Sequence, residues 1–310
     1  METQKMCSPE LVSVVMRTVG GRSKEIRRAI ASVAANTWRP LEVIVVYQGT
    51  QNTEWIELQK LPGEFTDLTI RVIHNNATGD RRAENLNIGW EASRGRYLGF
   101  LDDDDTLSPN HFALLVHAMQ SSSLAWAYAQ VILRKEDEAL NIVNESRPFR
   151  RHSFSLKALW EENFLPIHCF LLDRSELCEA MRRRPFHEEL DRSEDWDFLL
   201  RLAFYHKPVV IDEFTATYHV STGARNTNLS LMNTTNDEDK ERRNRDAWAR
   251  CQSIVEDRKN ALIPPLWWAR EYFSQERMPS SQKVSIEPVR RRSISQRIVR
   301  KLIRVLESLL

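Results

Sequence analysis

The sequence lacks several features that would assign a protein class at once. Its 310 residues include only four cysteines, and none forms a Cys-x-x-Cys pair, so neither a zinc knuckle nor a disulfide framework is predicted. The formal net charge is +1, which gives no overall field to attract a polyanion. We therefore expect no nucleic-acid partner and, from the scattered cysteines, a reducing cytoplasmic compartment.

Long apolar runs are also absent. No stretch approaches the roughly 18 apolar residues of a membrane-spanning helix. The opening METQKMCSPE has no apolar core of the kind found in signal peptides. A cytoplasmic protein of one large or two smaller domains is expected, and peripheral attachment to the cytoplasmic face of a membrane is an open alternative.

The first half of the sequence instead alternates apolar runs with helical patterns. Short apolar runs predict buried strands at residues 11–16, 41–47, 68–74 and 96–101. Helical spacing predicts helices at residues 23–36, with Ser23 as N-cap, at 81–93, and from Ser108-Pro109 onward. This alternation predicts an α/β fold with a mostly parallel sheet flanked by helices, in which ligands bind beyond the carboxyl ends of the strands.

The second half is less regular. Its patterns predict a strand at residues 126–133, helices at 153–163, 175–183, 193–206 (capped by Ser193) and near 246–255, and a strand-turn-strand unit at 208–220. The domain organisation expected from these patterns is an α/β domain over residues 1–222, with halves of about 1–120 and 121–222. A helical extension at 223–273 follows, and then a linker with a C-terminal helix at 274–310.

Four consecutive aspartates, Asp102 to Asp105, directly follow the fourth predicted strand. A strand-end Asp-x-Asp suits Mg²⁺ or Mn²⁺, which prefer carboxylate oxygen and keep coordination positions open for phosphate oxygens. The alternative is a solvated acidic turn in which Asp105 or Ser108 caps the next helix.

Two further positions are candidates for chemistry. Glu194-Asp195 falls in the first turn of a predicted helix, where acidic residues interact favourably with the helix dipole. The functional alternative is a general base that takes the proton of a sugar hydroxyl. His219 is either structural or a metal ligand, and a core role is expected for His168.

Taken in order, these features resemble the inverting glycosyltransferases of family 2, which have the GT-A fold. VSVVMRTVGGR is similar to the first strand of that family. NLNIGWEASRGRYLGFLDDDD matches its Asn-x-Gly helix, Gly-x-Tyr and Leu-Asp-x-Asp-Asp pattern without gaps. PFHEELDRSEDWDFLLRLA resembles the later Phe-x-Glu segment that leads to Glu-Asp-Trp. The resemblance covers roughly residues 11–222.

The resemblance implies transfer of a sugar from a nucleotide-diphosphate sugar to a hydroxyl of a glycan or lipid-linked glycan, in cell-surface glycan or polysaccharide synthesis. It implies Mg²⁺ or Mn²⁺ as cofactor, Asp195 as catalytic base, and Asp104 and His219 as metal ligands. The positions that it implies for the nucleotide-sugar are Thr18, Gln48, Arg81, Asn87, Asp102 and Asp103.

The chain departs from the family pattern at two places. Tyr47-Gln48-Gly49-Thr50 stands where Asp-Asp-Gly-Ser is usual, so Gln48 would contact the base edge and Tyr47 would stack on it. Leu86 stands where an arginine often precedes the asparagine, which leaves Arg81 or Arg82 to supply the positive charge.

Two other functions stay open beside the transferase. A nucleotidyltransferase also uses strand-end aspartates, but the Glu-Asp-Trp match argues against it. A non-catalytic nucleotide-sugar binding module would explain the missing acids at Gln48, but the intact Asp102, Asp104 and Asp195 argue against it.

The C-terminal stretch, from Arg290 to Leu310, has the pattern of a basic amphipathic helix. Its apolar stripe is formed by Ile294, Ile298, Leu302, Val305 and Leu309. Basic residues at other positions of the stretch give two readings, which are packing on a domain or partner and docking on an anionic membrane surface.

Overall fold

The computed structural model describes residues 8–222 and 238–262. The predicted linker and basic amphipathic helix at 274–310 lie outside these residues. The elements, in chain order, are β1 (Ser8–Thr18), α1 (Ser23–Ala34), β2 (Leu41–Gln48), α2 (Thr53–Leu58), α3 (Leu61–Glu64), β3 (Thr69–Asn75), α4 (Arg82–Ala92), β4 (Gly95–Asp102), β5 (Thr106–Leu107), α5 (His111–Ser122), β6 (Trp126–Glu136), β7 (Ile142–Ser146), α6 (Leu156–Glu161), η1 (Ile167–Cys169), β8 (Phe170–Asp173), η2 (Glu179–Met181), α7 (Glu194–Tyr205), β9 (Val209–Ser221) and α8 (Glu238–Ala261).

One nine-stranded mixed sheet organises the described chain, with the order β3-β2-β1-β4-β8-β6-β9-β5 and β7 paired to β6. The four predicted strands of the first half, β1 to β4, pair in parallel. Strand β8 then runs antiparallel between β4 and β6, so the sheet becomes mixed in its second half. Because β1 and β4 are parallel neighbours, Arg17 pairs in register with Asp102 at the strand ends. These ends form one edge of the site.

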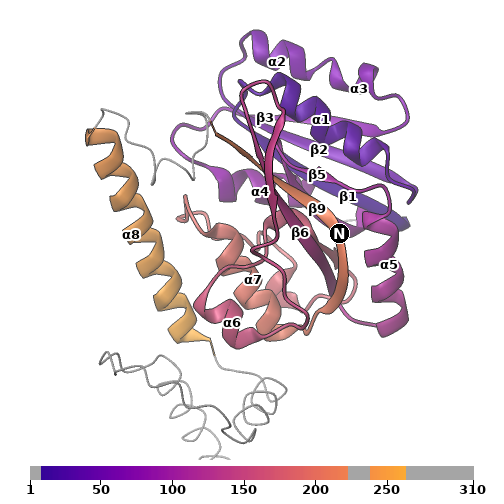
Figure 1. The fold of residues 1–310 in the computed structure, drawn as a ribbon, viewed down its shortest axis with the longest axis vertical. Helices are drawn as coiled ribbons and strands as arrows, with labels where there is room; N and C mark the ends of the chain where they lie inside the picture. Colours follow the sequence, from indigo (N-terminus) through magenta and orange to yellow (C-terminus); the bar gives the residue numbers. More distant parts are fainter. Residues whose placement is uncertain (1–7, 223–237, 263–310) are drawn as a thin grey trace, which may run out of the picture.

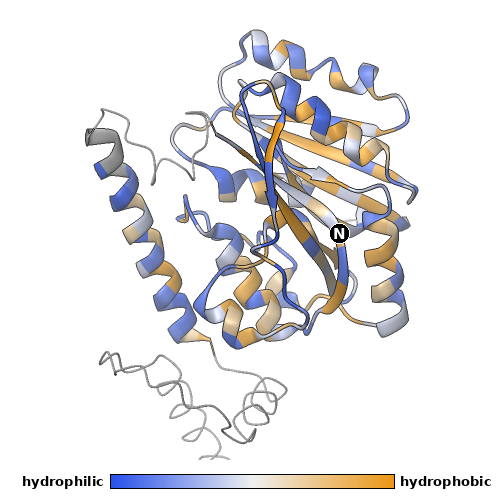
Figure 2. Ribbon diagram, viewed as in Figure 1, coloured by the Kyte–Doolittle hydropathy of each residue, from blue (hydrophilic) through white to orange (hydrophobic). Residues whose placement is uncertain are grey.

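The core lies around this sheet, which has helices on both sides (Figure 1). All eight residues of β2 are buried, and the strands carry most of the hydrophobic colour in Figure 2. Continuous apolar runs of this kind are expected when both faces of a strand are covered. Helix α4 lies close to β1 at Gly89, where an added Cβ would stand 2.3 Å from Cγ1 of Val15. The glycine of the Asn-x-Gly motif therefore permits this close packing.

Several local predictions were wrong at the element ends. Ser23 is the first residue of α1, and α5 begins only at His111, after Asn110 at its N-cap. Ser193 does stand at the N-cap of α7, but its φ of 59° lies in the left-handed region and its side chain makes no capping bond. An N-cap side chain reaches the first-turn N–H groups only from extended backbone, so the serine pattern alone was misleading.

The predicted helix at 175–183 and the predicted turn within 208–220 were also wrong. The former contains only the short 3-10 helix η2. The latter is one 13-residue strand, β9, whose pairing with β6 shifts register on both sides of Gln130. A shift in register lets a strand pass a polar stretch without ending, and the turn-like Asp212-Glu213 sits at this irregularity.

Helix α8 extends well beyond the helix predicted near residues 246–255. It lies along the side of the molecule that carries α6 and α7 (Figure 1). Arg258 Nε lies 2.5 Å from the carboxylate of Asp197 in α7, and Lys259 Nζ lies 4.0 Å from the ring centroid of Trp196. These contacts attach a helix of low apolar content to the start of α7.

Candidate active site

A cavity of about 1050 Å³ lies beyond the ends of β1 and β4. Its walls come from elements far apart in the sequence: the residues after β1, the aspartate turn after β4, the loop before α4, the ends of α6 and α7, and the inner side of α8. All four aspartates line it, as do Thr18, Gln48, Asp195 and His219. Most of the predicted site residues are therefore brought together.

The first two aspartates are paired with groups from the end of β1. Arg17 donates from Nε to Asp102 Oδ1 at 2.9 Å, and its Nη1 donates to Glu194 at the start of α7. Thr18 donates its hydroxyl to Asp103 Oδ2 at 2.5 Å. Burial alone would lower the pKa of Arg17, but the two carboxylates raise it, so this guanidinium is a permanent charge that ties the ends of β1 and β4 to α7.

Arg22 bridges the second and third aspartates, with Nη1 at 2.9 Å from Asp103 and 2.6 Å from Asp104. Arg17 and Arg22 together supply two positive charges to the four carboxylates of this turn. Burial, followed by the neighbouring carboxylate of Asp105, raises the pKa of Asp104 well above its usual range despite Arg22. Burial likewise raises the pKa of Asp103. Fully ionised, the turn would therefore carry more negative charge than its protein partners offset.

The fourth aspartate belongs to a buried polar cluster beneath the turn. Asp105 is fully buried and accepts the backbone N–H of His219 at 2.9 Å. The imidazole of His219 is held at both ends, with Nδ1 at 2.6 Å from Glu136 and Nε2 at 2.8 Å from the hydroxyl of Thr106. His168, also buried, has Nδ1 at 2.8 Å from Asp105 Oδ2. Its predicted core role agrees with this burial, although it also lines the cavity.

The carboxylate of Asp195 stands apart from the four aspartates. It accepts the backbone N–H of Trp196 at 2.8 Å and the side-chain amide of Asn163 at 3.1 Å. Burial raises its pKa to about 6; the adjacent Glu194 adds to the effect and Arg17 opposes it. A half-buried carboxylate with a raised pKa on the first turn of a helix is suited to accept a proton near neutral pH.

Some predicted nucleotide-sugar residues are used elsewhere. Asn87 is fully buried and bonds the backbone of Phe186, accepting from its N–H at 3.0 Å and donating to its C=O at 2.9 Å. Arg81 does not line the cavity, and its Nε donates to Thr78 O at 3.0 Å. Tyr47 is 1% exposed, and the rings of Trp55 and His74 each lie with their centroids 6.0 Å from its own, so this ring is too buried to stack on a base.

Gln48 does reach the cavity, but its amide is occupied. Its Nε2 donates to Gly79 O at 2.5 Å, and its Oε1 accepts from Asn85 at 3.0 Å. Asn85 in turn accepts from Asn75 at 2.7 Å. This row of amides fixes the loop that precedes α4.

Two arginines of the cavity, Arg17 and Arg22, were not assigned from the sequence, and Arg82 was named only as the alternative to Arg81. Arg82 makes an ion pair with Asp80 at 2.8 Å and lines the cavity where Arg81 does not. The only sequence signal for Arg17 is a charge that interrupts an apolar strand at its carboxyl end. Its partners lie 85 and 177 residues away, beyond the reach of local patterns.

No group of three or more His, Cys, Asp or Glu side chains has metal-binding geometry within the described ranges. A magnesium or manganese ion that also binds phosphate needs fewer protein ligands. Such ions take one or two carboxylates and keep their other coordination positions for water and phosphate oxygens. The strand-end carboxylates fit such an ion, since they are hard oxygen donors with uncompensated negative charge.

A mixed α/β sheet with carboxylates and arginines gathered at its parallel strand ends is the architecture of GT-A glycosyltransferases. The family model described as "Glycosyl transferase family 2" matches residues 13–186, which is more than half of the chain. The chain therefore belongs to glycosyl transferase family 2 and is an enzyme that transfers sugars.

Curated relatives agree with this assignment. An uncharacterized glycosyltransferase of Methanocaldococcus jannaschii is 27% identical over 215 residues, covering 68% of this chain and 71% of that protein. The putative colanic acid biosynthesis glycosyl transferase WcaA of Escherichia coli is 26% identical, covering 69% and 74%.

Solved structures show the same fold. S. aureus TarS (residues 1–349) gives a TM-score of 0.52 at 16% identity, covering 67% of this chain and 60% of that chain. The mannosyltransferase PcManGT of Pyrobaculum calidifontis, in complex with GDP-Man and Mn²⁺, gives 0.50 at 12% identity, covering 71% and 59%. The predicted GT-A fold is confirmed by this likeness. Within the described residues, no helix is long and apolar enough to cross a membrane.

Proposed function

We propose that the protein is an inverting, metal-dependent glycosyltransferase that moves a sugar from a nucleotide-diphosphate sugar to a hydroxyl of a glycan or lipid-linked glycan. The observation that carries this proposal is the pairing, in one cavity, of an over-charged strand-end aspartate turn with a separate carboxylate whose pKa is raised to about 6. The first group suits a cation and a diphosphate, and the second suits a hydroxyl.

The donor end of the cavity is the end that holds the aspartates and the arginines. Arg17, Arg22 and Arg82 present planar guanidinium groups of the kind that bind phosphate oxygens. Asp104, with Asp102 beside it, would hold Mg²⁺ or Mn²⁺, and the ion when bound would neutralise charge on the departing diphosphate. His219 would join only by releasing Glu136 or Thr106. Two solved neighbours support a nucleotide-sugar donor, namely the TarS complex with UDP-GlcNAc and the PcManGT complex with GDP-Man.

Asp195 would act on the acceptor. Its Oδ2 is held by Asn163 and its Oδ1 by the backbone of Trp196, so the carboxylate is fixed before a substrate arrives. It would take the proton of the attacking hydroxyl, and that oxygen would attack the anomeric carbon from the face opposite to the diphosphate. Only one protein base is needed. Much of the rate acceleration would come from holding the acceptor hydroxyl and the donor sugar in a fixed orientation.

The pathway and location are proposals at a coarser level. WcaA is named for colanic acid biosynthesis and RfbC of Myxococcus xanthus for O-antigen biosynthesis, which supports a role in cell-surface polysaccharide synthesis. Such a role suits an enzyme at the cytoplasmic face of a membrane, and the basic stretch at 290–310 would be its attachment.

A binding screen tests the proposal. Nucleoside diphosphates are titrated by calorimetry with Mn²⁺ and with a chelator, into the wild type, Asp104→Ala and Asp195→Asn. We expect one nucleotide to bind tightly with Mn²⁺, to lose that binding in Asp104→Ala, and to keep it in Asp195→Asn while turnover is lost. Binding indifferent to Mn²⁺ and to Asp104 would reject the metal-dependent site, and turnover by Asp195→Asn would reject the base.

A further inference from the structure

Helix α8 contributes to the cavity although it lies outside residues 13–186, the part that the family model matches. Trp248 and Gln252 both line the cavity. They are four residues apart and therefore lie on the same side of the helix, with Trp248 half-buried and Gln252 exposed at the cavity.

The helix is fixed against the segment that carries Asp195. Cys251 Sγ lies 2.9 Å from Asp191 Oδ1, and Arg192 lies 3.3 Å from Asn244 Oδ1. Further along, Arg258 and Lys259 contact Asp197 and Trp196 as described above. These contacts lie before, beside and after Trp248 along α8, so the tryptophan is held next to residues 191–197.

Trp248 presents an unused hydrogen-bond donor. Its indole Nε1 is buried and has no hydrogen-bond partner among the described residues. A buried unsatisfied N–H costs about 1–3 kcal/mol, so it marks a place where a ligand or water completes the structure. The other tryptophan of the cavity, Trp196, already donates its Nε1 to Leu159 O at 2.7 Å.

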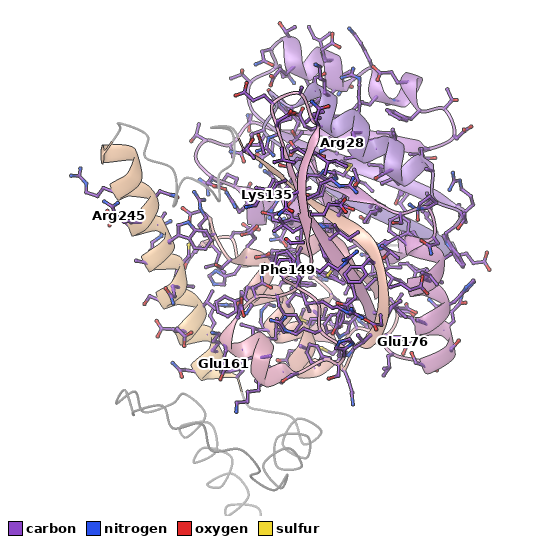
Figure 3. All side chains as sticks on the ribbon, viewed as in Figure 1. Arg28, Lys135, Phe149, Glu161, Glu176 and Arg245 are labelled. Atoms are coloured by element: carbon purple, nitrogen blue, oxygen red, sulfur yellow. The ribbon has the colours of Figure 1, made fainter. Side chains whose placement is uncertain are left out.

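The cavity also has aromatic, acidic and amide lining groups. Phe149 and Tyr218 line it with Glu161, Glu162 and Asn163 (Phe149 and Glu161 are labelled in Figure 3). Among the described lining residues, the only arginines or lysines are Arg17, Arg22 and Arg82, and carboxylates outnumber them. Aromatic faces with a few fixed polar groups suit a pyranose ring, and the excess of carboxylates disfavours a carboxylate or phosphate on it.

We infer that Trp248 and Gln252 form the acceptor subsite, which takes a single neutral pyranosyl residue and presents its hydroxyl to Asp195. The inference rests on the proposed function, because it assumes that Asp195 is the base. Trp248 stacks on the sugar and donates its indole N–H to a ring substituent, and Gln252 binds a second hydroxyl.

The test uses methyl glycosides as probe acceptors. The full-length protein, its accepted nucleotide-sugar donor and Mn²⁺ are incubated with methyl hexopyranosides, N-acetylhexosaminides and hexuronides, and nucleoside diphosphate release above the acceptor-free rate is measured. For wild type we expect release with a neutral glycoside and at least tenfold less with the matching hexuronide. The variants are Trp248→Phe, Trp248→Ala and Gln252→Ala, with Ser253→Ala, an exposed neighbour, as control.

Trp248→Phe keeps a ring and loses the N–H, so the acceptor KM should rise about fivefold, which corresponds to about 1 kcal/mol. Trp248→Ala should raise it by more than tenfold, and Gln252→Ala by about threefold to fivefold. The donor KM should stay unchanged in all variants, and a thermal unfolding midpoint close to that of the wild type shows that they fold. Ser253→Ala should match wild type.

Three results would overturn the inference without touching the proposed function. These are an unchanged acceptor KM in both Trp248→Ala and Gln252→Ala, a rise in donor KM that assigns Trp248 to the donor, and a wild type that binds and hydrolyses the donor yet uses no neutral glycoside. Failure of the wild type to bind any nucleoside diphosphate would instead reject the proposed function, and with it the inference.

Discussion

Replacing Asp195 with asparagine should abolish turnover and, at alkaline pH, make the protein more stable. Burial raises the pKa of this carboxyl group to about 6 from its ordinary 3.8. Between these two values the folded chain binds a proton that the unfolded chain releases, so the wild type loses stability as pH rises through this interval. The amide of the variant does not titrate and escapes this loss.

The magnitude follows from the two pKa values. At 1.36 kcal/mol per pH unit, the loss is about 3 kcal/mol, and partial solvent access to the carboxylate reduces it to about 2 kcal/mol. The carboxylate accepts one bond from Trp196 and one from Asn163, and an amide has one oxygen to accept them. One lost hydrogen bond costs about 1 kcal/mol, so a net gain of about 1 kcal/mol is expected well above pH 6.

Urea unfolding of wild type and Asp195→Asn at about pH 4.5 and about pH 8 measures this difference, because the linkage acts only above the lower pKa. The stability of the variant relative to wild type should improve by about 1–2 kcal/mol between the two conditions. Asp257→Asn, at an exposed aspartate of α8, serves as control and should show no such change. A difference between variant and wild type that is the same at both pH values would refute the reasoning that burial raises this pKa.

Three further outcomes are expected. The kcat/KM of the wild type should fall about tenfold per pH unit below about pH 6, because a protonated Asp195 accepts no proton; a flat profile down to pH 5 would remove it as the base. Arg22→Ala should lower the free energy of unfolding by about 1–2 kcal/mol, measured by thermal unfolding. Millimolar Mn²⁺ should restore this stability, because the ion replaces the lost positive charge beside Asp104, and no gain with Mn²⁺ would argue against a cation there. Asn87→Ala should cost about 2 kcal/mol by urea unfolding and leave nucleoside diphosphate affinity within about twofold, because its bonds go to Phe186; a large loss of affinity would restore its predicted nucleotide role.

The strands of the first half could be predicted because strands buried on both faces are written as continuous apolar runs. The ends of these strands could be predicted for the same reason, and with them the position of the aspartate turn. The antiparallel insertion of β8 could not be predicted, since its four residues carry no pattern that selects β4 and β6 as neighbours. The domain boundaries stay predictions.

Within the site, the sequence identified residue types better than their uses. The aspartates and Asp195 were found because their chemistry is visible in a short motif. Asn87 belongs to an equally recognisable motif, but its side-chain amide is hydrogen-bonded to the backbone of Phe186, 99 residues away, and so has a structural role. Contacts of such length depend on the folded arrangement, and local spacing carries no information about them.

The row of amides at Gln48, Asn85 and Asn75 makes the shape of the loop before α4 independent of pH, whereas the charge of Asp195 depends on pH. Carboxamides do not titrate, and Asp80, the acid of the loop that they hold, is kept ionised by Arg82, which lowers its pKa although burial opposes this. The loop wall beside the expected nucleotide is thus insensitive to acidity over the interval in which Asp195 changes its charge. A fall in pH would slow the reaction at the base while the amide-held loop keeps its shape.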